Sequence, residues 1–351
     1  MNEILATVRL QFHRGFTLTD AEHWVDYYAN LGISHFYASP LQASRAGSPH
    51  GYDGIDPTRI DPELGGEAAL ERLVSRLRSR GMGLILDIVP NHLAVGGSQN
   101  RWWQDVLAWG NDSPYAEFFD IDWHSDDPQL TGKLLVPFLG DAYAEILQSG
   151  ELVLGYDADT AGFHVDYHEH RFPIDPRHYG DILRFADHNA LHEQAAFFDA
   201  LQQREDAYTA AGDARYQLRK VMESPAARQS LDAVIALFGS ANPTVLLDFI
   251  PCLSASITAW PGGAPLPMKL IGGVFLMLPN WVGYVSKFRR FLKLFTPYRY
   301  GWLKKAGSMG CESTMSMGLP TLAATACSCV SALMPCRKSD QQRHRAMLLS
   351  M

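Results

Sequence analysis

The sequence predicts an α/β protein whose N-terminal part is the beginning of a (β/α)8 barrel, with an insertion after the third strand. Short apolar segments alternate with helix-period segments between residues 7 and 92. Polar and aromatic residues follow successive strands, where such barrels carry their active sites. A doubly wound parallel sheet is the alternative, but no glycine-rich phosphate-binding motif follows any of these strands, so nothing indicates nucleotide binding.

The first strand, helix and second strand form one βαβ unit. Thr7 to Phe12 is the first predicted strand. Thr19 or Asp20 can cap a helix that runs through Ala29. The segment from Ile33 to Ser39 then has the composition of the next strand.

A second unit follows the same order. Gly66 to Arg80 is predicted to be a helix because its apolar residues recur at helical intervals (Leu70, Leu73, Val74 and Leu77) and Gly81 follows it. The apolar run from Met82 to Leu86 is the third strand, and its continuity is typical of a strand buried on both faces.

A helix is predicted after this strand. Trp102 and Trp103 start an amphipathic helix and are expected to belong to the core. Leu152 to Phe172 alternates like a β-hairpin, and Ala190 to Met222 has the pattern of two charged helices. The expected organisation is therefore three βα units over residues 1–125 and an insertion region over residues 126–238.

Two motifs place sugar-binding residue types after predicted strands. One is the segment His50 to Asp56 (HGYDGID), and the other is Asp87 to His92 (DIVPNH). Taken alone, a loop tyrosine or a histidine near a strand end is an ordinary structural residue. Tyr52 between Gly51 and Asp53, and His92 beside Asp87, favour a site instead.

Asp87 to His92 resembles the first signature of the α-amylase superfamily of glycoside hydrolases. Within it, the chain from about residue 5 to about residue 235 resembles the maltooligosyl trehalose synthase family in the order and spacing of several segments. These are Arg9 to Phe12, Ser39-Pro40, Gly47 to Asp53, Asp61 to Gly66, Trp102 to Leu107, Phe118 to Trp123, Leu139 to Asp141 and His170 to Pro173.

The resemblance implies an α-amylase-type barrel and a (1→4)-α-D-glucan 1-α-D-glucosylmutase activity. This activity moves the reducing-end glucose of a maltooligosaccharide into an α,α-1,1 link and retains configuration. Retention needs a carboxylate nucleophile and a carboxylic acid about 5 Å apart. Both carboxyl groups follow later strands in the superfamily, and the reading frame of the given sequence encodes neither of them. No catalytic residue is therefore assigned, and the chain as printed is expected to be inactive.

The resemblance does assign a substrate-binding set. Tyr52 would stack on the glucose ring, and His92 would hydrogen-bond its 6-hydroxyl. Asp87 would hold the arginine of the strand-four motif, which is absent here, so Asp87 is expected to lack its partner. His50 and Asp53 shape the same loop.

Asn91 completes the substrate-binding set. The corresponding residue binds a structural calcium in many amylases, but no further ligand set accompanies it here. We therefore predict no metal and no cofactor.

Composition changes sharply along the chain. All five cysteines and eight of the eleven methionines lie after residue 240, where three acidic residues stand against twelve Lys and Arg. A basic accessory domain that binds nucleic acid or an anionic surface could produce this change. A reading-frame error could also produce it.

Back-translation favours the frame error. Reading Leu247 to Trp260 from the third base of each codon permits RFHSLLERQHYRLA, and a stretch within Trp302 to Pro320 permits GWVDGVRVDHVDGLA. Both strings resemble the next parts of the same family in the correct order. We therefore interpret residues 239–351 as an out-of-frame tail that is not natively folded after about residue 240.

The tail shows no sustained helical or strand period. Leu270 to Val285 and Leu319 to Cys336 lack charge, but their composition fits aggregation-prone segments better than membrane spans. Cys327 and Cys329 are one residue apart, which does not fit a zinc site.

The expected partner is a maltooligosaccharide or α-1,4-glucan, with no nucleic acid and no membrane, and the chain is expected to be a monomer if it folds. The N-terminus lacks a long apolar segment, which predicts the cytoplasm. Two other functions stay open, a non-catalytic remnant that binds glucan or fails to fold, and a hydrolytic α-amylase relative. Three strands of an eight-stranded barrel leave exposed edges, so little soluble protein is expected.

Overall fold

The computed structural model describes residues 3–90, 92–124, 131–141 and 143–239, and the backbone of two later strands. The helices are α1 (Leu18–Asn30), α2 (Gly66–Ser79), α3 (Arg101–Trp109), α4 (Tyr143–Ser149), α5 (Tyr179–Leu183), α6 (Asn189–Ala200), α7 (Ala207–Val221) and α8 (Pro225–Gly239). The strands are β1 (Thr7–Leu10), β2 (His35–Ala38), β3 (Gln42–Ser44), β4 (Gly54–Ile60), β5 (Gly83–Leu86), β6 (His92–Ala94), β7 (Leu134–Leu139), β8 (Val153–Asp157), β9 (Gly162–Tyr167), β10 (His170–Pro173), β11 (Ile257–Pro261) and β12 (Trp281–Gly283).

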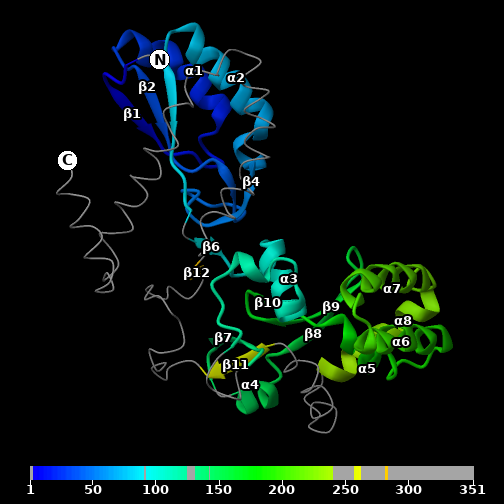
Figure 1. Cartoon of the computed structure of the whole chain (residues 1–351). Helices are drawn as coiled ribbons and strands as arrows, with labels where there is room; N and C mark the ends of the chain where they lie inside the picture. The colour runs from blue at the N-terminus through cyan, green and yellow to red at the C-terminus, as the bar shows by residue number, and fades with distance from the viewer. Residues whose placement is uncertain are drawn as a thin grey trace, which may run out of the picture.

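The three predicted strands form one parallel sheet in the order β1-β2-β5, with Val8 opposite Phe36 and Phe36 opposite Leu84. Figure 1 shows α1 and α2 side by side on one face of this sheet. Their apolar residues and alternate strand residues make one buried cluster, which includes Leu18, Val25, Phe36, Leu73 and Leu77. The predicted βα units are therefore confirmed, each strand being slightly shorter than expected.

Helix α1 begins earlier than the sequence suggested. Its N-cap is Thr17, whose hydroxyl accepts from the backbone N–H of Asp20 while the Asp20 carboxylate accepts from the N–H of Thr17. This reciprocal capping box satisfies two backbone donors that have no partner within the helix. The expected cap at Thr19 or Asp20 is wrong, because Asp20 acts as the third helical residue of the box.

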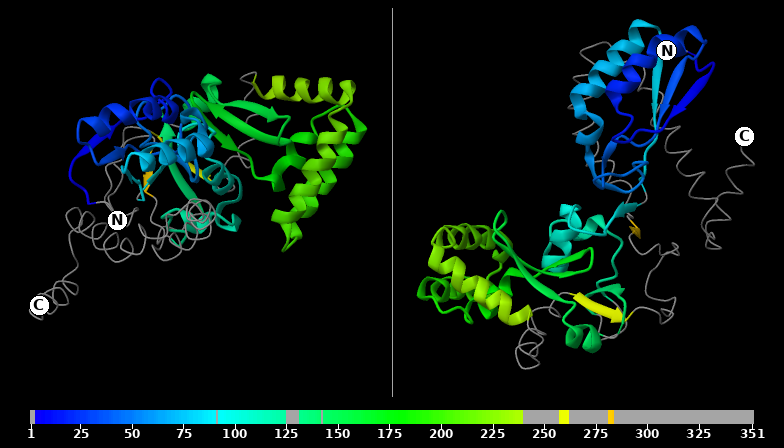
Figure 2. Two further views of the ribbon diagram at one scale, coloured as in Figure 1. Left: turned by 90° about the horizontal axis from the view of Figure 1, so that it is seen from above. Right: turned by 180° about the vertical axis from the view of Figure 1, so that it is seen from behind.

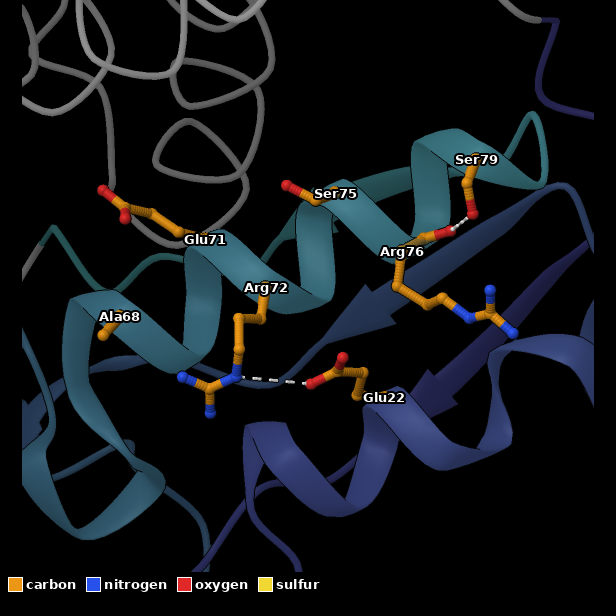
Figure 3. Close-up of a pocket in the computed structure, with 7 residues that line it drawn as sticks. All are labelled: Glu22, Ala68, Glu71, Arg72, Ser75, Arg76 and Ser79. Atoms are coloured by element: carbon orange, nitrogen blue, oxygen red, sulfur yellow. Dashed lines mark hydrogen bonds and ion pairs between the residues drawn. The ribbon is translucent and has the colours of Figure 1, made fainter.

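Arginines at every fourth position of α2 connect it to α1. Arg72 lies 3.6 Å from Glu22, Arg76 pairs with Asp26, and Arg80 lies 3.2 Å from Asp26. A shallow groove runs along this contact, lined by Glu22, Ala68, Glu71, Arg72, Ser75, Arg76 and Ser79 (Figure 3). These side chains are partly exposed, so solvent screens the pairs and each contributes at most about 1 kcal/mol.

Strand β5 is not buried on both faces, contrary to expectation. None of its residues is buried: Leu86 is 37% exposed, and Ile88 just beyond the strand is 39% exposed. Within the described residues β5 pairs with β2 alone and forms an edge of the sheet. A closed barrel would place a fourth strand against this edge, which explains the apolar sequence.

The insertion region has its own sheet and core. Strands β8, β9 and β10 form an antiparallel sheet in the order β10-β9-β8, so the predicted hairpin is present and carries a third strand. Helices α5 to α8 lie together beside this sheet (Figures 1 and 2). Their buried residues join those of the sheet in one large cluster that includes Phe163, Tyr179, Phe198 and Leu218.

The core prediction for helix α3 is confirmed for one tryptophan. Trp103 is 1% exposed and packs edge-on against Phe119. Trp102 is only partly buried and packs against Tyr115 and Phe118.

Two short strands are described in the part of the chain expected to be out of frame. Strand β11 pairs in parallel with β7, and β12 pairs antiparallel with β6. The remaining residues after 239 lie outside the described part of the chain. The prediction that this tail is not natively folded falls mostly on those residues.

Candidate functional site

The parallel sheet carries different chemistry on its two faces. Successive strand residues point to opposite faces. Val8, Leu10, Phe36 and Leu84 belong to the cluster with α1 and α2. Arg9, Tyr37 and Ile85 are opposite one another in the strand register and therefore lie on the other face. We call this second face, opposite α1 and α2, the site face.

A polar cluster connects the site face to the loop after β3. The Tyr52 hydroxyl donates to Oδ2 of Asp87 at 2.5 Å, and the Tyr37 hydroxyl donates to the same oxygen at 3.3 Å. Arg9 Nη2 donates to the Tyr52 oxygen at 3.0 Å. In place of the arginine that the resemblance implies, two phenols supply hydrogen bonds to Asp87.

Backbone geometry brings Tyr52 to this cluster. Gly51 has φ of 75°, a left-handed conformation that glycine adopts without strain. A Cβ atom on it would lie 2.6 Å from the carbonyl oxygen of Pro40. Gln11 Nε2 also donates to the carbonyl of Pro49 at 2.9 Å. The first strand and the segment after the second strand therefore hold the loop together.

His50 and Asp53 shape the loop that carries Tyr52. Ser48 Oγ donates to Asp53 at 2.5 Å and accepts from the N–H of Gly51 at 3.0 Å. His50 Nδ1 accepts from the N–H of Tyr52 at 3.0 Å and lies 3.7 Å from Asp53. These contacts define the turn immediately before and after Tyr52.

His92 contacts the same loop from β6. Its Nε2 lies 3.0 Å from the carbonyl oxygen of Tyr52. Because a carbonyl only accepts, Nε2 must carry the hydrogen. Burial lowers the pKa of His92 to about 4, against a weaker opposing effect of Asp53. The imidazole is therefore neutral at neutral pH, with Nδ1 unprotonated.

The cluster also changes the acidity of its phenols. The hydrogen bond to Asp87 raises the pKa of Tyr52, with burial acting in the same direction and Arg9 opposing both. The charge of Asp87 raises the pKa of Tyr37. Both phenols therefore stay protonated at neutral pH and act as donors to the carboxylate.

The structure brings five of the predicted site residues into one region, His50, Tyr52, Asp53, Asp87 and His92. The sixth, Asn91, lies outside the described residues. Arg9 and Tyr37 also belong to the cluster, although neither is among the site residues predicted from the sequence. Strand alternation could have identified them, because each stands between two apolar residues that face the helices and therefore points to the opposite face of the sheet.

The cluster can bind a polyhydroxylated ligand but does not supply glycosyl transfer by itself. An aromatic ring, a guanidinium and a carboxylate together offer a stacking face, donors and acceptors. Retaining transfer needs two carboxyl groups about 5 Å apart. In the described cluster Asp87 Oδ2 accepts from two phenols, and Asp53 Oδ1 accepts from Ser48.

Neither metal nor membrane features occur in the described part of the chain. No group of three or more His, Cys, Asp or Glu residues there could hold a metal ion. No helix among the described residues is both long and apolar enough to cross a bilayer.

Residues 20–150 match the family "Alpha amylase, catalytic domain". This segment includes two of the three strands of the parallel sheet and all six predicted site residues. The matched part of the chain is therefore similar to a segment of an α-amylase-type catalytic domain.

The N-terminal half is homologous to the maltooligosyl trehalose synthases. A protein of Mycobacterium tuberculosis (strain ATCC 25618 / H37Rv) with that name is 44% identical over 190 residues, which is 52% of this chain and 21% of the relative. The intracellular maltogenic amylase of Bacillus subtilis (strain 168) is 40% identical over 97 residues, 28% of this chain and 16% of the amylase.

A solved structure agrees with this relationship. "DSM5389 glycosyltrehalose synthase" is 27% identical and superposes with a TM-score of 0.51, covering 80% of this chain and 29% of that one. The chain spans about a fifth of the length of the maltooligosyl trehalose synthase relative.

Proposed function

We propose that this chain carries the N-terminal, glucose-binding part of a maltooligosyl trehalose synthase. The observation that carries the proposal is the hydrogen-bonded cluster of Tyr52 and Asp87, in a segment 44% identical to a relative of that name. The substrate would be an α-1,4-glucan, with the glucose at the scissile bond stacked on Tyr52. His92, neutral and partly buried beside the loop, would hydrogen-bond that glucose.

The reaction would be an intramolecular transglucosylation with retention, formally an isomerisation. Its nucleophile and general acid would come from later barrel strands. We infer that a frame change near residue 238 replaced them with the present tail, so that this copy does not turn over. Asp87 would then bind the phenols rather than an arginine of a fourth strand.

The frame proposal is supported by composition and by the extent of the homology. All cysteines and most methionines lie in the tail, and the 190-residue match covers 52% of the chain. Sequencing the gene across the codons for Phe238 to Phe249 tests it directly. We expect a missing or extra base relative to a full-length synthase gene, and an uninterrupted authentic frame would contradict it.

Activity measurements test the rest of the function. Maltopentaose incubated with the printed chain should give no trehalose-ended product, whereas the frame-restored gene product should give it. Formation of such a product by the printed chain would overturn the proposal. Release of glucose or maltose by the frame-restored protein without trehalose-ended product would favour a hydrolytic α-amylase relative.

A non-catalytic glucan-binding remnant is the second candidate, because the sugar-facing cluster lies wholly within the homologous half. Saturable maltopentaose binding by the inactive chain, with a structured near-ultraviolet circular dichroism spectrum, would support it. We also propose a cytoplasmic, monomeric protein, which fractionation of cells and sedimentation can test.

A further inference from the structure

We propose that Arg9 is a positioning residue that holds the Tyr52 ring in place for sugar stacking. This inference rests on the proposed function and extends it to a residue of the first strand. It follows from how the hydrogen bonds of the Tyr52 hydroxyl are arranged.

The Tyr52 hydroxyl is held from two sides. Its single hydrogen points to Asp87, since a carboxylate only accepts. The guanidinium of Arg9 can then only donate to a lone pair of the same oxygen, at 3.0 Å. A phenol with one anchor can swing about it, but two anchors from different strands fix the direction of the ring.

The two anchors come from the two outer strands of the three-stranded sheet. Arg9 belongs to β1 and Asp87 directly follows β5, while Tyr37 of the intervening β2 donates to the same carboxylate oxygen. The guanidinium carbon of Arg9 also lies 6.0 Å from the centre of the Tyr37 ring. The strand order β1-β2-β5 therefore sets the distance between the two anchors of Tyr52.

Charge supports this assignment. Arg9 and Asp87 have opposite charges, and the phenol between them donates to the anion and accepts from the cation. Hydrogen bonds with an ionised partner are stronger than neutral ones. A planar guanidinium loses less freedom per hydrogen bond than a flexible ammonium, so lysine should substitute only in part.

The test compares variants of the full chain in two measurements. Arg9→Met removes the donors and keeps a similar length, Arg9→Lys keeps one charged donor, and Arg14→Met is the matched control at an exposed arginine nearby. Calorimetry measures maltopentaose binding. Ultraviolet difference titration, with Tyr52→Phe to identify the signal, measures the ionisation of Tyr52.

We expect Arg9→Met to weaken maltopentaose binding about tenfold. It should also raise the pKa of Tyr52, because Arg9 lowers that pKa in the native protein. Arg9→Lys should restore part of both effects, and Arg14→Met should change neither. Unchanged Tyr52 ionisation and binding in Arg9→Met would overturn the inference, as would equal effects of Arg9→Met and Arg14→Met.

Failure of the proposed glucan-binding function and failure of the positioning role of Arg9 give different experimental results. If the native chain binds no maltopentaose, the proposed glucan-binding function fails while the Tyr52 titration still decides whether Arg9 contacts the phenol. If binding occurs and Tyr52 ionisation does not respond to Arg9→Met, the positioning role fails while the function stands.

Discussion

A Cβ atom on Gly51 would lie 2.6 Å from the carbonyl oxygen of Pro40, closer than such atoms come in folded proteins. Gly51 also has a φ of 75°. Its N–H is bonded to Ser48 Oγ, and Tyr52 follows it directly. The residue before Tyr52 is thus constrained both by backbone conformation and by space.

Gly51→Ala should therefore displace Tyr52 from the cluster. We expect a loss of about 2 to 4 kcal/mol in stability, from the left-handed backbone and the contact with Pro40 together, and loss of maltopentaose binding. Urea unfolding measures the loss of stability, and calorimetry measures maltopentaose binding. Gly32→Ala is the control, because Gly32 has φ of 90° with no atom within 4 Å of its Cβ position. Equal effects of the two substitutions would show that the contact with Pro40 is unimportant.

Asp87→Asn should alter the phenols in a defined direction. The hydrogen bond to Asp87 is the largest cause of the raised pKa of Tyr52, so removing the charge should lower that pKa. Alkaline difference titration against Tyr52→Phe measures the change. Because Arg9→Met acts in the opposite direction, the double variant should lie between the two single variants. An Asp87→Asn protein with a higher Tyr52 pKa would contradict the assigned contact.

The lowered pKa of His92 predicts that the stability of the protein depends on pH. Its folded-state pKa of about 4 is below the ordinary 6.5, so the unfolded chain takes up a proton more readily between these values. Stability is therefore highest above pH 6.5 and falls as pH drops toward 4. Because the ring is partly exposed and screened, we expect a contribution of about 1 to 2 kcal/mol.

Urea unfolding at pH 7 and pH 4.5 measures this contribution by comparing the native chain with His92→Gln. The glutamine variant should lose less stability on acidification than the native chain. An equal loss in both proteins would mean that other groups carry the acid sensitivity. His50→Gln serves as a second histidine control from the same loop.

The sequence predicts the backbone framework well because local signals set it. Glycines 32 and 81 separate helical patterns from apolar strand segments, and these signals predict β2, α2 and β5 within a few residues. The start of α1 is harder, because Thr17, Thr19 and Asp20 all have side chains that can cap a helix. Only the reciprocal hydrogen bonds of Thr17 and Asp20 decide between them.

Burial and site membership depend on contacts that a local pattern does not contain. Leu86 belongs to an apolar run, yet it lies at an edge and is 37% exposed. Arg9 is exposed to solvent, and only its hydrogen bond to Tyr52, forty-three positions later, places it at the site. Tyr52 and Asp87 were predicted separately from their motifs, and only the fold shows that they share a hydrogen bond.

Ending the chain after Gly239 should leave a cooperatively folding protein. The buried side chains of the described cores all lie between Leu10 and Phe238. Among the described strand pairings, the truncation removes those of β11 with β7 and of β12 with β6. It also removes the uncharged runs of the tail, so the soluble fraction should rise.

The matched control for this truncation ends the chain after Val221 and so removes α8. That helix contributes Ala227, Leu231, Val234 and Phe238 to the largest core. Losing these side chains exposes much of the core, so the shorter protein should lose its near-ultraviolet circular dichroism and its cooperative urea transition. The chain ending at Gly239 should keep both. If it unfolds without cooperativity while the full chain does not, residues after 239 contribute to the native fold, and the interpretation of the tail as an out-of-frame addition loses its structural support.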